Sequence, residues 1–395
     1  MIVALGLLAG AYMAVWQFMV TYVLVYVSEH MGSNPLIIGL VGSMQSIGFI
    51  VGLLFIMPRI ELARSYRGAL IVAPIISALV LKLLFSASSV GLLMVLYVIY
   101  NVNVAIFLVS VYSIVSDIMP PNEWGSGISK FRAITGLVMV ATVIVNSRLA
   151  SQQEILVQAM TVLLMGTGLL GVFIVPRAPL IPQRSIYQLD VFIDKLSRMT
   201  SGLVMASGLS GGALSYYRRI TSYALGGGIR LAWVLIASLV FKMGIDSIMV
   251  QIPPIAASTV GSRVLFTAVA LGLAGYTVAA YAADRTGNGK MVMILASIAG
   301  IAVALILGGS LHHSTAFIAV YTLVYSLLGL FDVESASLAL KSDPTRIRFQ
   351  PIAVNAGAIM GDLIGGLVIV LYSPSHLVYF SAAAFALAVL LWKKI

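Results

Sequence analysis

The sequence predicts an all-α membrane protein with twelve transmembrane helices, arranged as two six-helix bundles. Hydrophobic residues make up 61% of the chain and charged residues only 9%, whereas about a quarter of the residues in a soluble domain are charged. Twelve apolar stretches are each long enough to cross a bilayer core, which takes about 20 residues. The positive charges fall almost entirely on alternate loops between these stretches.

The twelve predicted spans differ only in whether they carry charge. A charge-free span is expected at residues 1–28, 35–57, 90–116, 155–175, 264–283, 291–309, 315–331 and 377–392. A span with a few charges inside it or at one end is expected at residues 68–87, 125–147, 229–254 and 349–372.

The basic residues predict the topology. The net charge of +10 would fit a nucleic-acid partner, but the excess lies in short loops between spans. Such a bias follows the positive-inside rule, so we expect a multi-pass protein of the cell membrane with both termini in the cytoplasm and no nucleic-acid partner. The chain has no cysteine, which excludes disulfides, thiolate metal sites and a cysteine nucleophile.

The chain divides into six spans, a linker and six more spans. We expect an N-terminal bundle at residues 1–175, a cytoplasmic linker at 176–228 and a C-terminal bundle at 229–395. Apolar residues recur at helical spacing in the linker, which predicts an amphipathic helix lying on membrane lipid. The fourth and tenth spans share a pattern of paired tyrosines, a phenylalanine and then a loop with an acid and a proline, which indicates an internal repeat.

A loop motif follows the eighth span. The run Asp284-Arg285-Thr286-Gly287-Asn288-Gly289-Lys290 resembles the loop signature of the major facilitator superfamily, which is Asp-Arg-x-Gly followed by basic residues. The corresponding loop after the second span keeps charge but lacks the Asp-Arg pair. The segment from Ser116 to Gly125 is similar to the superfamily's loop between spans four and five, with Trp124 where an arginine is usual.

The resemblance implies a fold and a mode of action. It implies two bundles related by a pseudo-twofold axis, secondary transport by alternating access, and a cytoplasmic latch that closes and opens between them. The latch would contain the charged loop residues and one loop glycine, namely Glu61, Arg64, Arg67, Asp117, Asp284, Arg285, Gly287 and Lys290.

Glycines at four-residue spacing mark two spans. Small residues at this spacing let helix backbones approach closely in lipid. The second span has Gly48 and Gly52, and the eleventh has Gly357, Gly361 and Gly365. The resemblance implies that these two spans face each other, so we expect a close crossing in the outward-open state. The alternative is packing within one bundle.

Three charged residues lie well inside the seventh and eleventh predicted spans. Lys242 and Asp246 are four residues apart on one face of the seventh span, and Asp362 lies near the middle of the eleventh. A charge at the centre of a membrane helix is costly, so such residues usually face a cavity or a partner. One interpretation is a neutralising pair; the other is that Asp246 or Asp362 carries a coupling proton while Lys242 binds substrate.

Uncharged polar residues complete the predicted substrate site. The resemblance implies that spans one, four, seven and ten line a central cavity. An amide, indole or phenol there can fix a substrate by hydrogen bonds among apolar walls, or it can merely join helices. The candidates are Trp16, Gln17, Asn101, Asn103, Tyr321 and Tyr325.

The predicted function is secondary active transport of a small molecule, coupled to protons, by a monomer without cofactor or metal. The mostly apolar and aromatic candidates favour an amphipathic or hydrophobic substrate, and therefore export over nutrient uptake. One rival is a sensor or scaffold on the same fold that transports nothing. The other is a membrane-embedded lipid-modifying enzyme, which would need clustered carboxylates or histidines at a loop edge.

Overall fold

A computed structural model describes residues 1–63, 65–118, 124–149, 152–175, 231–283, 288–342 and 349–395. The predicted linker at 176–228 and its amphipathic helix lie outside these residues. The described part consists of helices and short connections, so the predicted all-α class is confirmed.

The N-terminal helices follow the predicted spans. They are α1 (Ile2–His30), α2 (Pro35–Val51), η1 (Gly52–Ile56), α3 (Met57–Ala63), α4 (Tyr66–Phe85), α5 (Val90–Ile118), α6 (Trp124–Leu149) and α7 (Gln153–Ile174). The second span runs through α2, η1 and α3 without a break. Asn34 caps its start by accepting a hydrogen bond from the Ile37 amide at 3.0 Å, and Pro35 occupies the first turn, where no backbone donor is needed.

The C-terminal helices also match their predicted spans. They are α10 (Leu231–Thr259), α11 (Ser262–Ala283), α12 (Gly289–Ser310), α13 (Ser314–Ser342), α14 (Phe349–Leu371) and α15 (Pro374–Lys393). In the described part of the chain, 11 helices are long and apolar enough to cross a membrane. The remaining predicted span is α6, whose apolar portion is the shorter segment Ile134–Leu149.

The second span contains one wide turn. The segment η1 at Gly52–Ile56 is a π-helix, in which the hydrogen bonds skip one more residue than in an α-helix. Gly52 lies against Val102 and Ala105 of α5, and a Cβ atom there would come within 2.8 Å of the Ala105 methyl group. The wide turn therefore sits where the second span packs closely on α5.

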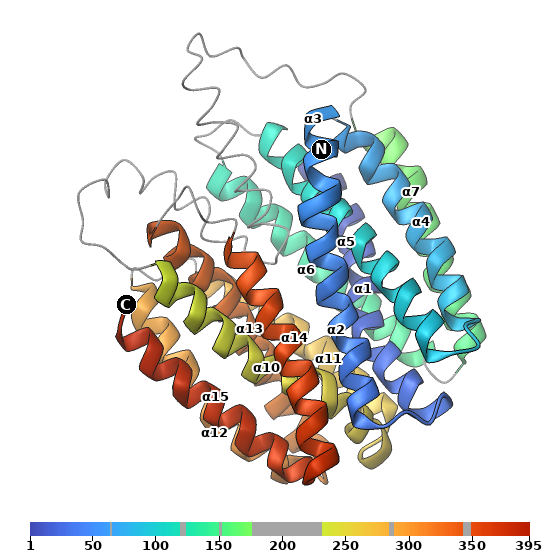
Figure 1. Cartoon of the computed structure of the whole chain (residues 1–395). Coiled ribbons are helices and arrows are strands. Elements are labelled where there is room, and N and C mark those ends of the chain that lie inside the picture. Colours follow the sequence, from blue (N-terminus) through green and yellow to red (C-terminus); the bar gives the residue numbers. More distant parts are fainter. Residues whose placement is uncertain (64, 119–123, 150–151, 176–230, 284–287, 343–348) are drawn as a thin grey trace.

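The helices gather into an N-terminal group, α1 to α7, and a C-terminal group, α10 to α15 (Figure 1). We call these groups the N-half and the C-half. Pairs such as α4 and α5 pack within the N-half, and α11 and α13 within the C-half. Contacts between the halves run from α2 to α14, from α6 to α11 and from α1 to α10.

Successive spans alternate in direction, which defines two ends of the molecule. The short-loop end carries the connections at 31–34, 86–89, 260–261, 311–313 and 372–373. The opposite end, which we call the linker end, carries both termini. The exact boundaries of the two predicted bundles stay predictions.

The packing has the character expected of a lipid environment. Large apolar side chains such as Leu137, Val162 and Phe173 are 72%, 70% and 85% exposed. Bare apolar surface on this scale would be unfavourable in water and suits lipid. The inside is aromatic: Tyr12 stacks on Phe107 with ring centres 4.0 Å apart.

Candidate functional site

The first predicted pair of site residues joins two helices of the N-half. The indole Nε1 of Trp16 on α1 donates to Oδ1 of Asn101 on α5 at 3.0 Å. The amide of Asn101 donates in turn to the Tyr97 carbonyl at 2.8 Å. Because both ends of the Asn101 side chain are bonded, it serves here to link α1 and α5.

The other two amides differ in their surroundings. Asn103 is buried and donates to the Ile99 carbonyl of its own helix at 2.8 Å. Gln17 is half-buried on α1, and its side chain makes no hydrogen bond within the part of the chain that the structure describes. Of the predicted amides, Gln17 is the one left available to a ligand.

Lys242 and Asp246 form the ion pair that their spacing predicts. Lys242 Nζ lies 2.8 Å from Asp246 Oδ1, and the two side chains are 15% and 11% exposed. The neighbouring Phe241 stacks on Phe331 of α13 at 4.7 Å and meets Phe385 of α15 at 5.1 Å. This aromatic packing fixes the face of α10 that carries the pair.

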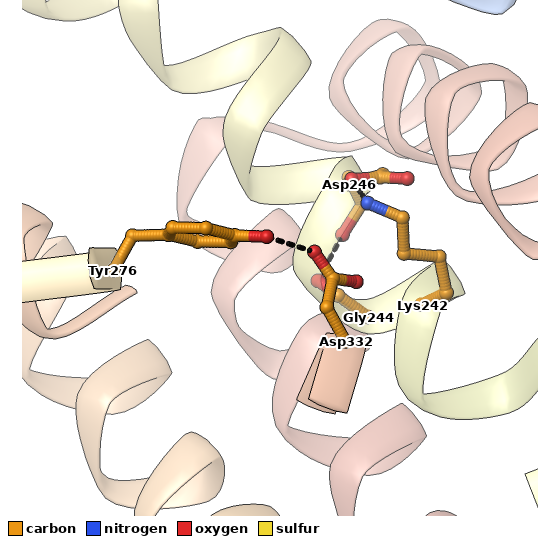
Figure 2. A network of polar contacts seen from close by, with 6 residues as sticks. Lys242, Gly244, Asp246, Tyr276 and Asp332 are labelled. Atoms are coloured by element: carbon orange, nitrogen blue, oxygen red, sulfur yellow. Dashed lines mark hydrogen bonds and ion pairs between the residues drawn. The ribbon is translucent and has the colours of Figure 1, made fainter. Parts of the chain in front are cut away.

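A second acidic group lies in the same region, and sequence reasoning missed its role. Asp332 on α13 is buried, and its Oδ2 accepts a hydrogen bond from the Tyr276 hydroxyl of α11 at 2.9 Å. Figure 2 shows Tyr276 pointing at Asp332 beside the Lys242–Asp246 pair. Asp332 also acts electrostatically on Lys242. Three helices of the C-half thus contribute to one charged cluster.

Asp362 lies at the contact between the halves. Its side chain is 2% exposed, and its Oδ1 has no hydrogen-bond partner in the described structure. On the other side of the contact is Gly42 of α2, where a Cβ atom would be 3.2 Å from Asp362 Oδ2. The charged groups that act on Asp362 are Asp246 and Lys242.

Three buried tyrosine hydroxyls lack partners in the described residues. They belong to Tyr100 on α5 and to Tyr321 and Tyr325 on α13, and Thr21 of α1 lies near enough to act on the Tyr325 hydroxyl. Tyr321 and Tyr325 form a T-shaped ring pair with centres 5.5 Å apart. An unpaired hydroxyl at this depth is unfavourable, so these phenols are the best candidates for hydrogen bonds to a ligand. Tyr100 was not among the residues predicted from sequence.

The predicted latch falls mostly outside the described residues. Asp284, Arg285 and Gly287 are not described, nor are the side chains of Glu61, Arg64 and Asp117. Arg67 donates to the Val172 carbonyl at 2.9 Å, which joins α4 to α7. Lys290 donates to the Lys393 carbonyl at 3.1 Å, which joins α12 to α15. Both bonds stay within one half, and the latch stays a prediction.

The predicted glycines make close contacts within each half. Gly48 approaches the Val98 carbonyl of α5, where a Cβ would lie at 2.6 Å. Gly357 and Gly361 lie against the Leu239 and Met243 carbonyls of α10, and Gly365 lies against Ser247 of the same helix. In this structure the alternative of packing within one bundle therefore holds. The expected crossing in the outward-open state stays a prediction.

Other glycines bring the halves together. Gly39 of α2 lies against the Asp362 carbonyl, and Gly366 of α14 lies against Pro35, where a Cβ would be 2.5 Å from the carbonyl oxygen. Gly42 contacts Val250 of α10. The predicted pairing of the second and eleventh spans is thus seen at the short-loop end, through residues that the sequence did not single out.

We expect the variant Gly361→Ala to destabilise the C-half. Its new methyl group would meet the Met243 backbone, and overpacking of this kind typically costs about 1–3 kcal/mol. Thermal unfolding of the purified protein should therefore show a midpoint several degrees lower. Gly166→Ala is the matched control, because a Cβ there would have nothing within 4 Å. Equal midpoints for the two variants would contradict the close contact.

The comparison with known families decides the class of protein. Residues 4–348 match the Major Facilitator Superfamily, which is most of the 395-residue chain. The chain belongs to the major facilitator superfamily. The resemblance seen in the loop motif is confirmed, and so is the twelve-helix fold.

Solved superfamily structures resemble the whole chain. A mutant form of the nucleoside transporter NupG has a TM-score of 0.75 at 12% identity and covers 99% of this chain and 98% of its own. Unmutated NupG has a TM-score of 0.70 at 13% identity, with the same coverages. The xylose transporter XylE from E. coli, in a partially occluded inward-open conformation, has a TM-score of 0.66 at 14% identity and coverages of 100% and 96%.

At these identities the likeness establishes the fold and not the substrate. No curated protein matches the chain in sequence. This superfamily member is a multi-pass membrane transporter for a small molecule, and it is not an enzyme. The described residues contain no group of three or more His, Cys, Asp or Glu side chains that could hold a metal ion.

Proposed function

We propose that this superfamily member is a proton-coupled secondary transporter for an uncharged small molecule with a ring and several hydrogen-bonding groups. The observation that supports proton coupling most strongly is the environment of Asp362. Its carboxyl group is buried at the contact between the halves, and its Oδ1 has no hydrogen-bond partner in the described structure. An unpaired carboxylate in a membrane interior is costly, and protonation removes the charge.

The position of Asp362 suits a coupling role. Its backbone and side chain both face α2 of the other half, so the packing around it must change when the halves move. A group whose surroundings change in this way can bind a proton in one state and release it in the other. We therefore assign Asp362 as the proton carrier and place Asp246 second, because Lys242 already neutralises it.

The other polar groups favour an uncharged substrate. The Lys242–Asp246 pair carries no net charge, and the buried phenols of Tyr100 and Tyr321 are unpaired in the described residues. A phenol can donate to a hydroxyl, carbonyl or ring nitrogen, and its ring can stack on another ring. Nucleosides and pentoses have this chemistry, and the relatives of the same fold include a nucleoside transporter and a xylose transporter.

The first experiment identifies the ligand. The purified protein is screened by thermal shift with nucleosides and pentoses and with their phosphorylated forms, because a ligand that binds the native state raises its apparent stability. We expect uncharged compounds to stabilise the protein and phosphorylated ones to have no effect. Counterflow of the best ligand in proteoliposomes then tests transport. A sensor or scaffold would bind the ligand and move nothing.

The phenols give a sharper test. In Tyr321→Phe and Tyr325→Phe the ring is kept and only the hydroxyl is lost, so we expect about three- to tenfold weaker ligand binding, the effect of one neutral hydrogen bond. The control is Tyr372→Phe, since Tyr372 is 69% exposed at the short-loop end. Unchanged affinity in both phenol variants would remove these residues from the substrate site.

The direction of transport follows the sequence prediction. We retain export, driven by protons moving inward, with both termini in the cytoplasm. Both the direction and the orientation are measured in vesicles in which the orientation of the protein is known. The vesicles are loaded with ligand and placed in a more acidic outside solution. If the protein is an exporter, the ligand will move against its own concentration gradient. It will leave on the side of the membrane that the short-loop end faces.

A further inference from the structure

A single amide connects three helices across the contact between the halves. Gln251 on α10 is 2% exposed, and its Nε2 donates to the Pro35 carbonyl at 3.1 Å. The same nitrogen donates to the Asp362 carbonyl at 3.4 Å. Pro35 begins α2 in the N-half, whereas Asp362 is in α14, so one side chain bonds both sides of the contact.

Two glycines make the space for this amide. A Cβ atom at Gly39 would lie 3.1 Å from Gln251 Nε2, and a Cβ at Gly366 would lie at the same distance. Gly39 and Gly366 also bring the backbones of α2 and α14 into direct contact, at Asp362 and Pro35. The amide therefore fits because the side chains on both flanking helices are reduced to hydrogen atoms.

The rest of this contact offers little polar attachment. Ser43 Oγ lies 3.5 Å from the Ile359 carbonyl, at the limit of a hydrogen bond, and bonds its own helix at Gly39 at 2.9 Å. Val250 packs on Gly42 through methyl groups. Hydrogen bonds between helices stabilise association in lipid, and those of Gln251 are the shortest between helices at this junction of α2, α10 and α14 in the described structure.

We propose that Gln251 is a positioning residue that holds the short-loop end of the transporter closed. Its two hydrogen bonds tie α2 and α14 to α10, and the bond to the Pro35 carbonyl of the N-half breaks when the halves separate at this end. The inference rests on the proposed function only in taking the halves to alternate. Because Gln251 binds the backbone of Asp362, it also keeps that residue in the closed contact.

The test uses a single thiol as a reporter of opening. The chain has no cysteine, so Ser43→Cys places the only thiol at the contact, where Ser43 is 1% exposed. The protein is held in nanodiscs, where a water-soluble maleimide reaches both faces. Gln251→Met keeps the size of the side chain and removes the donor. We expect the thiol to react about three- to tenfold faster, as for the loss of one neutral hydrogen bond between the halves.

Two controls separate opening from general loosening. Gln158→Met makes the same change on the exposed face of α7 and should leave the rate at Ser43→Cys unchanged. Ser297→Cys places the reporter in the core of α12, where Ser297 is fully buried. Gln251→Met should not accelerate labelling there, because the C-half itself stays packed.

A second variant covers a failure of Gln251→Met to fold. Gly366→Ala would push α14 away from Pro35 and from the amide, and it should also accelerate labelling at Ser43→Cys. A folded Gln251→Met protein with the wild-type labelling rate would overturn the proposal, as would a Gly366→Ala protein with that rate. Labelling needs neither substrate nor a pH gradient, so it tests this inference separately from the proposed function. If Gln251→Met accelerates labelling but the wild-type protein transports nothing, the proposed function is wrong and this inference still holds.

Discussion

Asp362→Asn is expected to abolish proton-driven accumulation while leaving exchange of substrate in place. Asparagine has nearly the same size and shape as aspartate, but it cannot bind or release a proton at neutral pH. The contact with Gly42 and the Asp362 carbonyl bond to Gln251 are then retained. The loss should appear only in the response to a pH gradient.

The measurement compares two assays on the same proteoliposomes. Counterflow without a pH gradient should stay within about twofold of wild type, whereas accumulation driven by a gradient should fall by at least about tenfold, the equivalent of 1.4 kcal/mol of lost coupling. Glu154→Gln is the matched control, because Glu154 is an exposed carboxyl in the first turn of α7. Gradient dependence equal to wild type would end the assignment of Asp362.

Removing one member of the Lys242–Asp246 pair is expected to be the most destabilising single change of charge. Either Lys242→Met or Asp246→Leu leaves the other charge alone inside the bundle, and breaking a buried ion pair this way costs about 3–5 kcal/mol. The double variant removes both charges, so it should recover most of the lost stability.

The check is a double-mutant cycle of thermal unfolding in detergent. A large positive coupling supports the interpretation of a neutralising pair, and Lys82→Met at the exposed end of α4 serves as control. A double variant as unstable as the sum of the two singles would contradict the pair. A stable double variant that no longer transports would give Lys242 a role in transport as well.

The sequence predicted the architecture well because lipid imposes strong rules on it. Span length and charge placement depend on the bilayer rather than on tertiary contacts, and the spans fall where they were expected. The Lys242–Asp246 contact was also predictable, since a spacing of four residues brings two side chains together on one helix.

The contact between the halves was harder to predict. A glycine pattern shows that some helix comes close, but it does not say which one. The spacing of Gly361 was therefore compatible with a contact between the halves, although the residue packs on Met243 within its own half. Gln251 gave no sequence signal at all, because a lone amide near the end of a span acquires its role only when Pro35 and Asp362 come within reach.

The wide turn at Gly52–Ile56 changes the direction in which the later side chains of the second span point. A π-helical turn accommodates one additional residue, and each residue of an α-helix advances by about 100°. The stretch that continues to Met57 and Arg59 is therefore rotated relative to an uninterrupted helix. Deleting one residue from Gly52–Ile56 would restore the ordinary pitch with Arg59 near its present azimuth, whereas an ordinary α-helix that kept every residue would turn Arg59 by about 100°. The additional residue therefore sets which way that basic side chain points.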